Sequence, residues 1–153
     1  MGDRKLPENC LLRRALREDI GAIRRLVWGA RLDPTQLRWQ QFWVIARGGE
    51  IIACGQLRIF KDAQELGSLV VARGDRDRGL GRFLSRHLIQ EATKPLYLEC
   101  VGGKLAAFYE DLGFVAVKWE ELPRSLKFKF ALSQLAKVLV RLPVTFMFKP
   151  NSG

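Results

Sequence analysis

The segment best suited to bind an anion lies mid-chain, where a mostly apolar run at 66–72 leads into a turn rich in arginine and glycine. Arginines at 73, 76 and 78 precede Gly79 and Gly81, and apolar spacing predicts a helix over 79–93. The first amides of a helix have no intrahelical acceptor, and the helix dipole makes that end electropositive. Glycines let an anion approach the backbone closely. The segment therefore predicts a cradle for a pyrophosphate.

Other interpretations of this segment are an arginine-rich surface loop that precedes a helix, a Walker loop and a dinucleotide fingerprint. The Walker loop is excluded because no Gly-Lys-Ser/Thr follows. The dinucleotide fingerprint is excluded because Leu84 holds its third glycine position. The interpretation as a surface loop remains possible.

The cysteines and the single histidine do not indicate thiol or metal chemistry. Cys10, Cys54 and Cys100 lie far apart among apolar residues, which predicts three reduced and mostly buried thiols. His87 falls within the predicted helix, as a structural or exposed residue. We therefore expect neither a Cys/His nucleophile pair nor a bound metal.

The apolar pattern predicts a mixed α/β protein. Strands are expected at 10–15, 42–46, 50–60, 64–72, 96–101, 114–119 and 144–148, and the pair around Gly48-Gly49 is typical of a hairpin. Helices are expected at 19–30, with Asp19 as its cap, and at 79–93, 104–112 and 124–141. The 153 residues fit one domain, 1–153, with an extra helix at about 124–141 before the last strand.

Composition favours a water-soluble protein that attracts anions. Apolar residues make up 48% of the chain, enough for a core, and no run approaches the length of a spanning helix. The polar N-terminus carries no secretory pattern, so we expect a cytoplasmic protein without a transmembrane segment. The net charge of +10 suits nucleic acid, anionic lipid, an acidic protein or a phosphate-rich cofactor.

Two motifs together resemble a known family. Residues 76–81, Arg-Asp-Arg-Gly-Leu-Gly, resemble the R/Q-x-x-G-x-G/A motif of the GNAT superfamily of N-acetyltransferases. Residues 106–114, which end in Phe-Tyr-Glu-Asp-Leu-Gly-Phe, resemble its second signature. The resemblance implies an α/β (α+β) fold: a mixed, mainly antiparallel sheet of six to seven strands with a parallel, splayed central pair and flanking helices. It also implies transfer of an acetyl group from acetyl-CoA to a primary amine of an unidentified small molecule or protein, by direct attack in a ternary complex.

The resemblance implies roles for individual residues. Main-chain groups of Leu69, Val70 and Val71 would bind the pantetheine arm. Residues that would bind the pyrophosphate are Arg76, Asp77, Arg78, Gly79, Leu80, Gly81 and Arg82. Tyr109 would protonate the leaving thiolate, or else pack as a core aromatic. Glu65 would deprotonate the amine, with Glu99 as the other candidate; either carboxylate could instead be a solvated strand-end charge.

The chain also departs from the family pattern. Gly102-Gly103-Lys104 stands where relatives often carry a cofactor-binding asparagine, and a helix is expected within 123–143, where the family has a short connection beside the acceptor site or a dimer interface. Two other functions stay open: a non-catalytic acyl-CoA-binding module, or a basic domain that binds nucleic acid or an anionic membrane through the 124–141 helix. The chain is expected to be a monomer or a homodimer.

Overall fold

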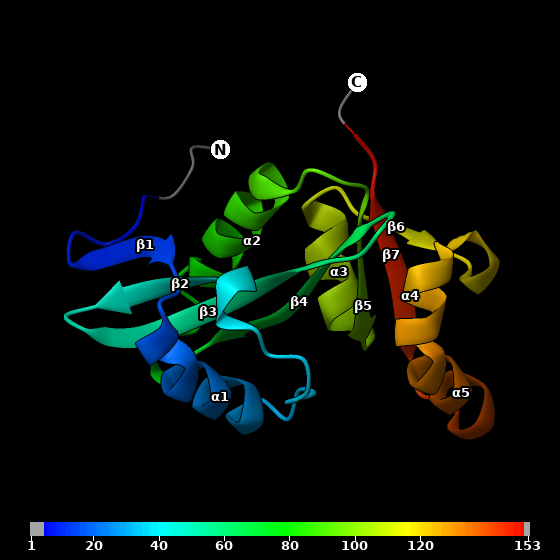
Figure 1. The fold of residues 1–153 in the computed structure, drawn as a ribbon, viewed down its shortest axis with the longest axis horizontal. Coiled ribbons are helices and arrows are strands. Elements are labelled where there is room, and N and C mark those ends of the chain that lie inside the picture. The colour runs from blue at the N-terminus through cyan, green and yellow to red at the C-terminus, as the bar shows by residue number, and fades with distance from the viewer. Residues whose placement is uncertain (1–4, 152–153) are drawn as a thin grey trace. The chain divides into compact units, whose positions relative to one another are not determined.

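A computed structural model describes residues 5–151 (Figure 1). The chain forms two compact units, which are described separately. Unit 1 comprises the residues up to Leu57 and Leu66–Glu91, and unit 2 comprises Arg58–Glu65 and the residues from Ala92 onward. The expectation of one domain over residues 1–153 stays a prediction.

The strands form a seven-stranded sheet in the order β1-β2-β3-β4-β5-β7-β6. Their bounds are β1 Cys10–Arg14, β2 Phe42–Arg47, β3 Glu50–Ile59, β4 Gln64–Val71, β5 Leu96–Val101, β6 Val115–Val117 and β7 Val144–Lys149. β4 and β5 pair in parallel, whereas β1 with β2, β2 with β3, β5 with β7 and β6 with β7 are antiparallel. This confirms the predicted mixed, mainly antiparallel sheet.

Five α-helices accompany the strands in the described part of the chain: α1 Ile20–Gly29, α2 Leu80–Glu91, α3 Gly103–Asp111, α4 Arg124–Lys129 and α5 Ala131–Val140. The expected helix over 124–141 is thus two helices, which meet at Phe130 (φ −91°, ψ 7°). Phe130 is fully buried with its ring stacked on Phe146, centroids 5.5 Å apart, so the core anchors the chain where the helix breaks.

Two local predictions have different outcomes. The hairpin between β2 and β3 turns at Gly48 (φ +55°) and Gly49 (φ +86°), left-handed values that glycine adopts without strain. Asp19 stands at the cap position of α1, but its carboxylate makes no cap bond to that helix. It accepts instead from the amide of Leu16, at the start of the 3-10 turn before α1, at 2.6 Å and from Arg13 of β1 at 2.7 Å.

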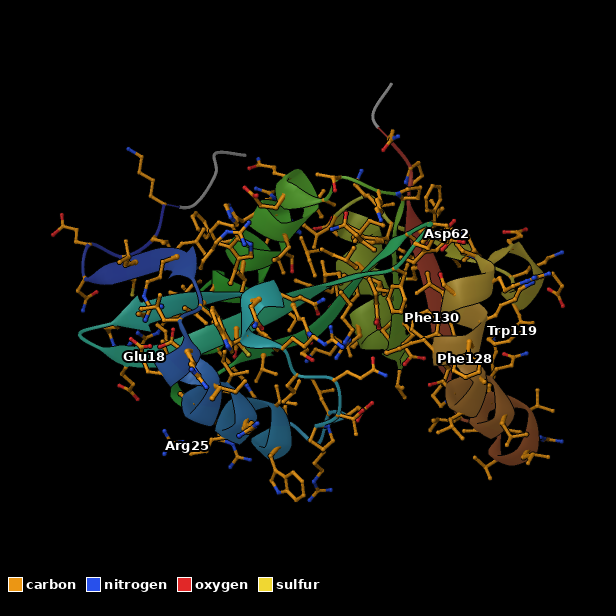
Figure 2. The ribbon with its side chains drawn as sticks, viewed as in Figure 1. Glu18, Arg25, Asp62, Trp119, Phe128 and Phe130 are labelled. Atoms are coloured by element: carbon orange, nitrogen blue, oxygen red, sulfur yellow. The ribbon has the colours of Figure 1, made fainter. Side chains whose placement is uncertain are left out.

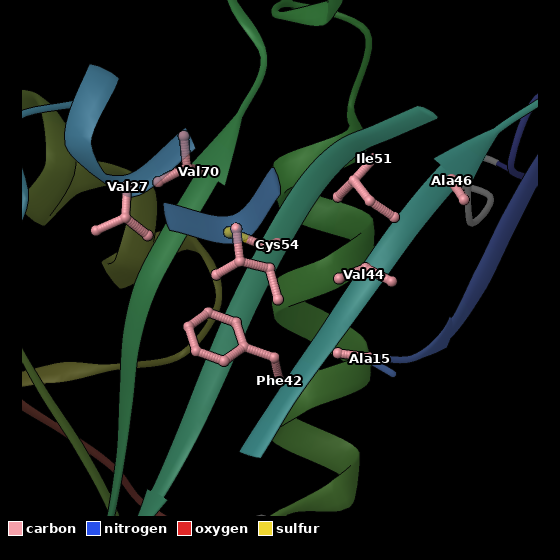
Figure 3. Close-up of a cluster of buried hydrophobic side chains, with 9 residues drawn as sticks. Ala15, Val27, Phe42, Val44, Ala46, Ile51, Cys54 and Val70 are labelled. Carbon is pink, nitrogen blue, oxygen red and sulfur yellow. The ribbon is translucent and has the colours of Figure 1, made fainter. Parts of the chain in front are cut away.

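The core of unit 1 lies between α1 and the first strands (Figure 3). Ile23 and Val27, four residues apart on α1, pack with Phe42, Val44 and Cys54. The next residue, Gly55, faces α2 on the other side of β3, since side chains alternate along a strand. A Cβ at Gly55 would lie 2.7 Å from Leu88 Cδ1, so α2 packs directly on this backbone.

The core of unit 2 lies beneath α4. Leu126 and Phe130, four residues apart, pack with Phe146 and Val144 of β7, and Ala63 completes the cluster. Tyr97 and Trp119 cover its margin. This packing fixes which side of the α4 helix faces the strands.

Candidate active site

The segment Arg73–Arg82, here called the arginine loop, connects β4 to α2 and includes the first residues of that helix. Its conformation is held by an ion pair, a side-chain hydrogen bond and turns. Asp75 is buried and forms a short ion pair with the Arg47 guanidinium. Arg76 folds back, and its Nε donates to the Val71 carbonyl at 3.1 Å. Asp77 (φ +64°) and Gly79 (φ +82°) adopt left-handed backbone conformations that turn the chain into α2. The loop therefore reaches the helix in a defined geometry.

The start of α2 presents backbone amides at the end of this loop. The Phe83 amide donates to the Gly79 carbonyl at 3.0 Å, which is the first hydrogen bond of the helix. The amides just before Phe83 therefore have no acceptor within the helix. A Cβ at Gly81 would lie 3.6 Å from the Val71 side chain, an ordinary contact, so protein packing does not require glycine there. Arg78 is exposed and Arg82 half-buried beside these amides. Backbone donors, a missing side chain and nearby cations together fit a pyrophosphate.

Strand β4 is irregular just before the residues expected to bind pantetheine. Ser68 has φ +51°, a left-handed value inside a strand, which marks a local kink. Its hydroxyl donates to Gln56 Oε1 at 3.3 Å, and its carbonyl accepts the Cys54 thiol at 3.5 Å. After the kink, Val70 is buried in the core of unit 1, whereas Leu69 and Val71 are half-buried.

In unit 2, Glu65 belongs to a buried group of charges, here called the charged cluster and defined as Arg58, Glu65, Glu99 and Lys129. Glu65 is 3% exposed and accepts from Arg58 Nη1 at 3.2 Å and from Lys129 Nζ at 3.0 Å. Both cations are themselves largely buried. The two positive partners occupy both of its carboxylate oxygens.

Glu99 has a different environment in the same cluster. It pairs in the ladder with Phe146, which places it on the face of the strands that α4 covers. Burial raises the pKa of the Glu99 carboxyl, and the negative charge of Glu65 raises it further. A hydrogen bond from Ser133 and the charges of Lys129 and Arg58 oppose this rise. Its Oε2 is buried and has no hydrogen-bond partner within the described part of the chain.

Tyr109 lies on α3 and is 7% exposed. Its ring packs edge-on against Phe114 and Phe108, with centroids 5.7 Å and 5.0 Å away. Burial, and to a lesser degree Cys100, raises the pKa of the Tyr109 phenol well above its ordinary value. The phenol therefore keeps its proton at neutral pH.

The site residues predicted from sequence fall into two groups. The arginine loop and Leu69–Val71 belong to unit 1, whereas Glu65, Glu99 and Tyr109 belong to unit 2. The ladder between β4 and β5 pairs Gln64 with Leu96 and Glu65 with Tyr97, so Glu65 stands next to β5.

Sequence reasoning missed Arg58, Lys129 and Ser68. An arginine between Leu57 and Ile59 in an apolar strand is a signal for a buried charge. Lys129 carries no such signal, because its partner lies 64 residues away.

The histidine and the cysteines occupy structural positions. His87 packs edge-on against Trp43, with centroids 4.2 Å apart, and lies 3.7 Å from Glu91. Cys54 and Cys100 are buried free thiols, and burial raises their pKa values to about 12 and about 11. Cys10 is half-buried and free. Among residues 5–151, no group of three or more His, Cys, Asp or Glu side chains is placed to hold a metal, and no helix is long and apolar enough to cross a membrane.

Several solved structures share this fold. N-acetylglutamate synthase from Neisseria gonorrhoeae, solved with coenzyme A and N-acetyl-glutamate, is 18% identical with a TM-score of 0.72; the match covers 93% of this chain and 35% of the synthase. This chain therefore spans about a third of the synthase. Rv2747 from Mycobacterium tuberculosis, solved with CoA, is 20% identical with a TM-score of 0.71, covering 92% and 99% of the two chains.

A GNAT-family acetyltransferase from Staphylococcus aureus Mu50 is 16% identical with a TM-score of 0.68, and the match covers 92% of this chain and 98% of that one. Comparison with curated protein sequences gave no match. The sequence model described as "Acetyltransferase (GNAT) domain" matches residues 38–116, a segment that contains both motifs and more than half of the chain. The chain belongs to the GNAT acetyltransferase family.

Proposed function

We propose that this protein is an acetyl-CoA-dependent N-acetyltransferase that acetylates a primary amine of a small molecule or protein in a ternary complex. The start of α2 carries the proposal. There the amides that precede Phe83, the glycine at 81 and the neighbouring arginines fit a pyrophosphate, and the chain belongs to a family of acetyltransferases. The free thiols support action in a reducing compartment such as the cytoplasm.

The arginine loop would hold the cofactor through its backbone more than through its side chains. Arg76 already donates to the Val71 carbonyl, so its role is to shape the loop. Amides from Asp77 to Arg82 would bind the pyrophosphate, and Arg78 and Arg82 would add positive charge. Main-chain groups of Leu69–Val71, redirected by the kink at Ser68, would bind the pantetheine arm. Bound acetyl-CoA supplies the activated acetyl thioester.

Tyr109 would protonate the leaving thiolate. The amine nitrogen bonds to the thioester carbonyl carbon, the carbon–sulfur bond breaks, and the sulfur needs a proton. A phenol is protonated at neutral pH, so Tyr109 has a hydrogen to donate before the reaction.

Glu99, rather than Glu65, is the better candidate for the base that takes the amine proton. Arg58 donates to Oε1 of Glu65 at 3.2 Å and Lys129 donates to its Oε2 at 3.1 Å, so cations already occupy both carboxylate oxygens. Glu99 has a raised pKa and a carboxylate oxygen without a partner in the described chain. A base with a raised pKa is a stronger proton acceptor at neutral pH.

The proposal is tested by calorimetry with acetyl-CoA on the wild type, Gly81→Glu and Gly74→Glu. Gly81→Glu places a carboxylate where the pyrophosphate would lie, so we expect at least hundredfold weaker binding. Gly74→Glu is the matched control, because Gly74 lies in the same loop with open space around it and adds the same charge. We expect it to reduce binding less than fivefold.

A wild type that does not bind acetyl-CoA, or two variants that lose affinity equally, would contradict the proposed cofactor site. If binding is retained but no amine releases free thiol from acetyl-CoA, the protein is a non-catalytic acyl-CoA-binding module.

A further inference from the structure

An apolar stripe lies on the outer side of α4 and α5 in unit 2. Leu132, Leu135 and Leu139 follow one another at intervals of three and four residues, which places them on one side of α5, and Phe128 lies on α4, before the break at Phe130. Phe128 is 89% exposed, Leu132 81%, Leu135 52% and Leu139 70%. Leu126 and Phe130, two residues before and two after Phe128, point the opposite way and are fully buried in the core of unit 2. Figure 2 labels Phe128 and Phe130. The stripe therefore faces away from that core.

The charged side chains on the two helices themselves are all positive. Residues 122–153 contain six lysines and arginines and no aspartate or glutamate. Lys129 is committed to Glu65, and Lys137 lies over the Phe146 ring. The other cations of this segment are Arg124 at the start of α4, Lys127, whose Nζ donates to the Glu120 carbonyl at 3.2 Å, and Arg141 directly after α5. An occupant of the stripe must accept apolar side chains and carry negative charge.

Charge complementarity selects among the possible occupants. A second copy of this chain would bring Arg124, Lys127 and Arg141 against the same residues, with no acidic side chain in the segment to pair with them. Nucleic acid would satisfy the cations and leave four large apolar side chains in water. An anionic lipid surface satisfies both, because phosphates meet the cations while leucine and phenylalanine enter the acyl boundary.

We propose that α4 and α5 dock this protein on anionic membranes, with the helices lying in the plane of the interface. Among the described residues no helix is long enough to span a bilayer, which agrees with attachment at its surface. The attachment combines two contributions, apolar insertion of the stripe and attraction of the cations to lipid phosphates.

The test is sedimentation of the full chain with vesicles of phosphatidylcholine alone or with one third phosphatidylglycerol. We expect binding to the anionic vesicles that weakens as salt rises, and little binding to the neutral ones. Leu132→Ser/Leu139→Ser should weaken binding at least tenfold. Its matched control is Leu11→Ser/Trp28→Ser, which removes apolar side chains that are 59% and 72% exposed in unit 1. The control should bind like the wild type.

A second pair of variants distinguishes the effect of the cations in the C-terminal segment from the effect of the net charge of the whole protein. Arg124→Gln/Lys127→Gln/Arg141→Gln should weaken binding about a hundredfold, whereas Arg24→Gln/Arg25→Gln/Arg31→Gln removes three exposed cations elsewhere and should weaken it less than threefold. Circular dichroism and acetyl-CoA binding establish that each variant is folded.

The proposal is overturned if the wild type ignores anionic vesicles at low salt, or if the two charge variants lose equal affinity. It is also overturned if the wild type sediments as a dimer that Leu132→Ser/Leu139→Ser converts to a monomer, which would assign the stripe to a second copy.

Discussion

The arginine loop and the charged cluster are built in opposite ways. The loop consists of consecutive residues, and the groups through which we propose that it binds the pyrophosphate are main-chain amides at the start of α2. The cluster combines side chains from β3, β4, β5 and α4, whose charges lie close together in a buried environment. A site made from backbone tolerates side-chain changes around it, whereas a buried ionic cluster does not.

Within the cluster, the comparison is sharpest between its two carboxylates. We expect Glu99→Gln to lower kcat by about a hundredfold or more, because it removes the proposed proton acceptor. Acetyl-CoA affinity should stay within twofold, as measured by steady-state kinetics and calorimetry. Glu110→Gln, an exposed change on α3, serves as the control. An unchanged kcat in Glu99→Gln would remove Glu99 from the mechanism.

Glu65→Gln should act on folding instead. It leaves Arg58 and Lys129 buried without their carboxylate, so we expect the free energy of unfolding to fall by about 3 kcal/mol. Urea denaturation followed by circular dichroism measures this loss. A Glu65→Gln protein as stable as the wild type, with kcat reduced more than in Glu99→Gln, would exchange the roles of the two carboxylates.

The loop should respond weakly to side-chain changes. Asp75→Asn removes the ion pair with Arg47 that holds the loop, and we expect the KM for acetyl-CoA to rise about fivefold, equivalent to roughly 1 kcal/mol. The matched control is Glu50→Gln, since Glu50 is exposed and lies 3.9 Å from the same arginine. A rise beyond a hundredfold would show that the loop depends on side chains as strongly as the cluster does.

The smallest effect is a pH dependence of stability. Folding raises the pKa of Glu99, so between its ordinary pKa and the raised value the folded state binds more protons than the unfolded state. Stability then falls as pH rises through that window. Urea midpoints of the wild type should decline relative to Glu99→Gln as pH increases from about 4. Parallel midpoints in the two proteins would mean that Glu99 is not perturbed.

The same contrast explains what sequence could predict. The arginine loop, the hairpin at Gly48-Gly49 and the order of strands and helices depend on neighbouring residues, so local patterns indicated them. The charged cluster depends on contacts across as many as 64 residues, and nothing near Lys129 predicts its partner. The C-terminal helices show a further limit. Both sides of α4 carry apolar residues, and only tertiary packing selects Leu126 and Phe130 for burial over Phe128.

On the two sides of the junction at Phe130, the C-terminal helices should differ in stability: we expect α5 to unfold locally at a lower free-energy cost than α4. α4 is held by Leu126 and Phe130, whereas α5 contributes no buried residue along its length. Opening α5 therefore exposes little new apolar surface, and its amides should exchange with deuterium much faster than those of the strands beneath α4. A helix whose folded and locally unfolded states are close in free energy is suited to reversible attachment. Binding then needs to supply only a small free energy to keep the helix folded.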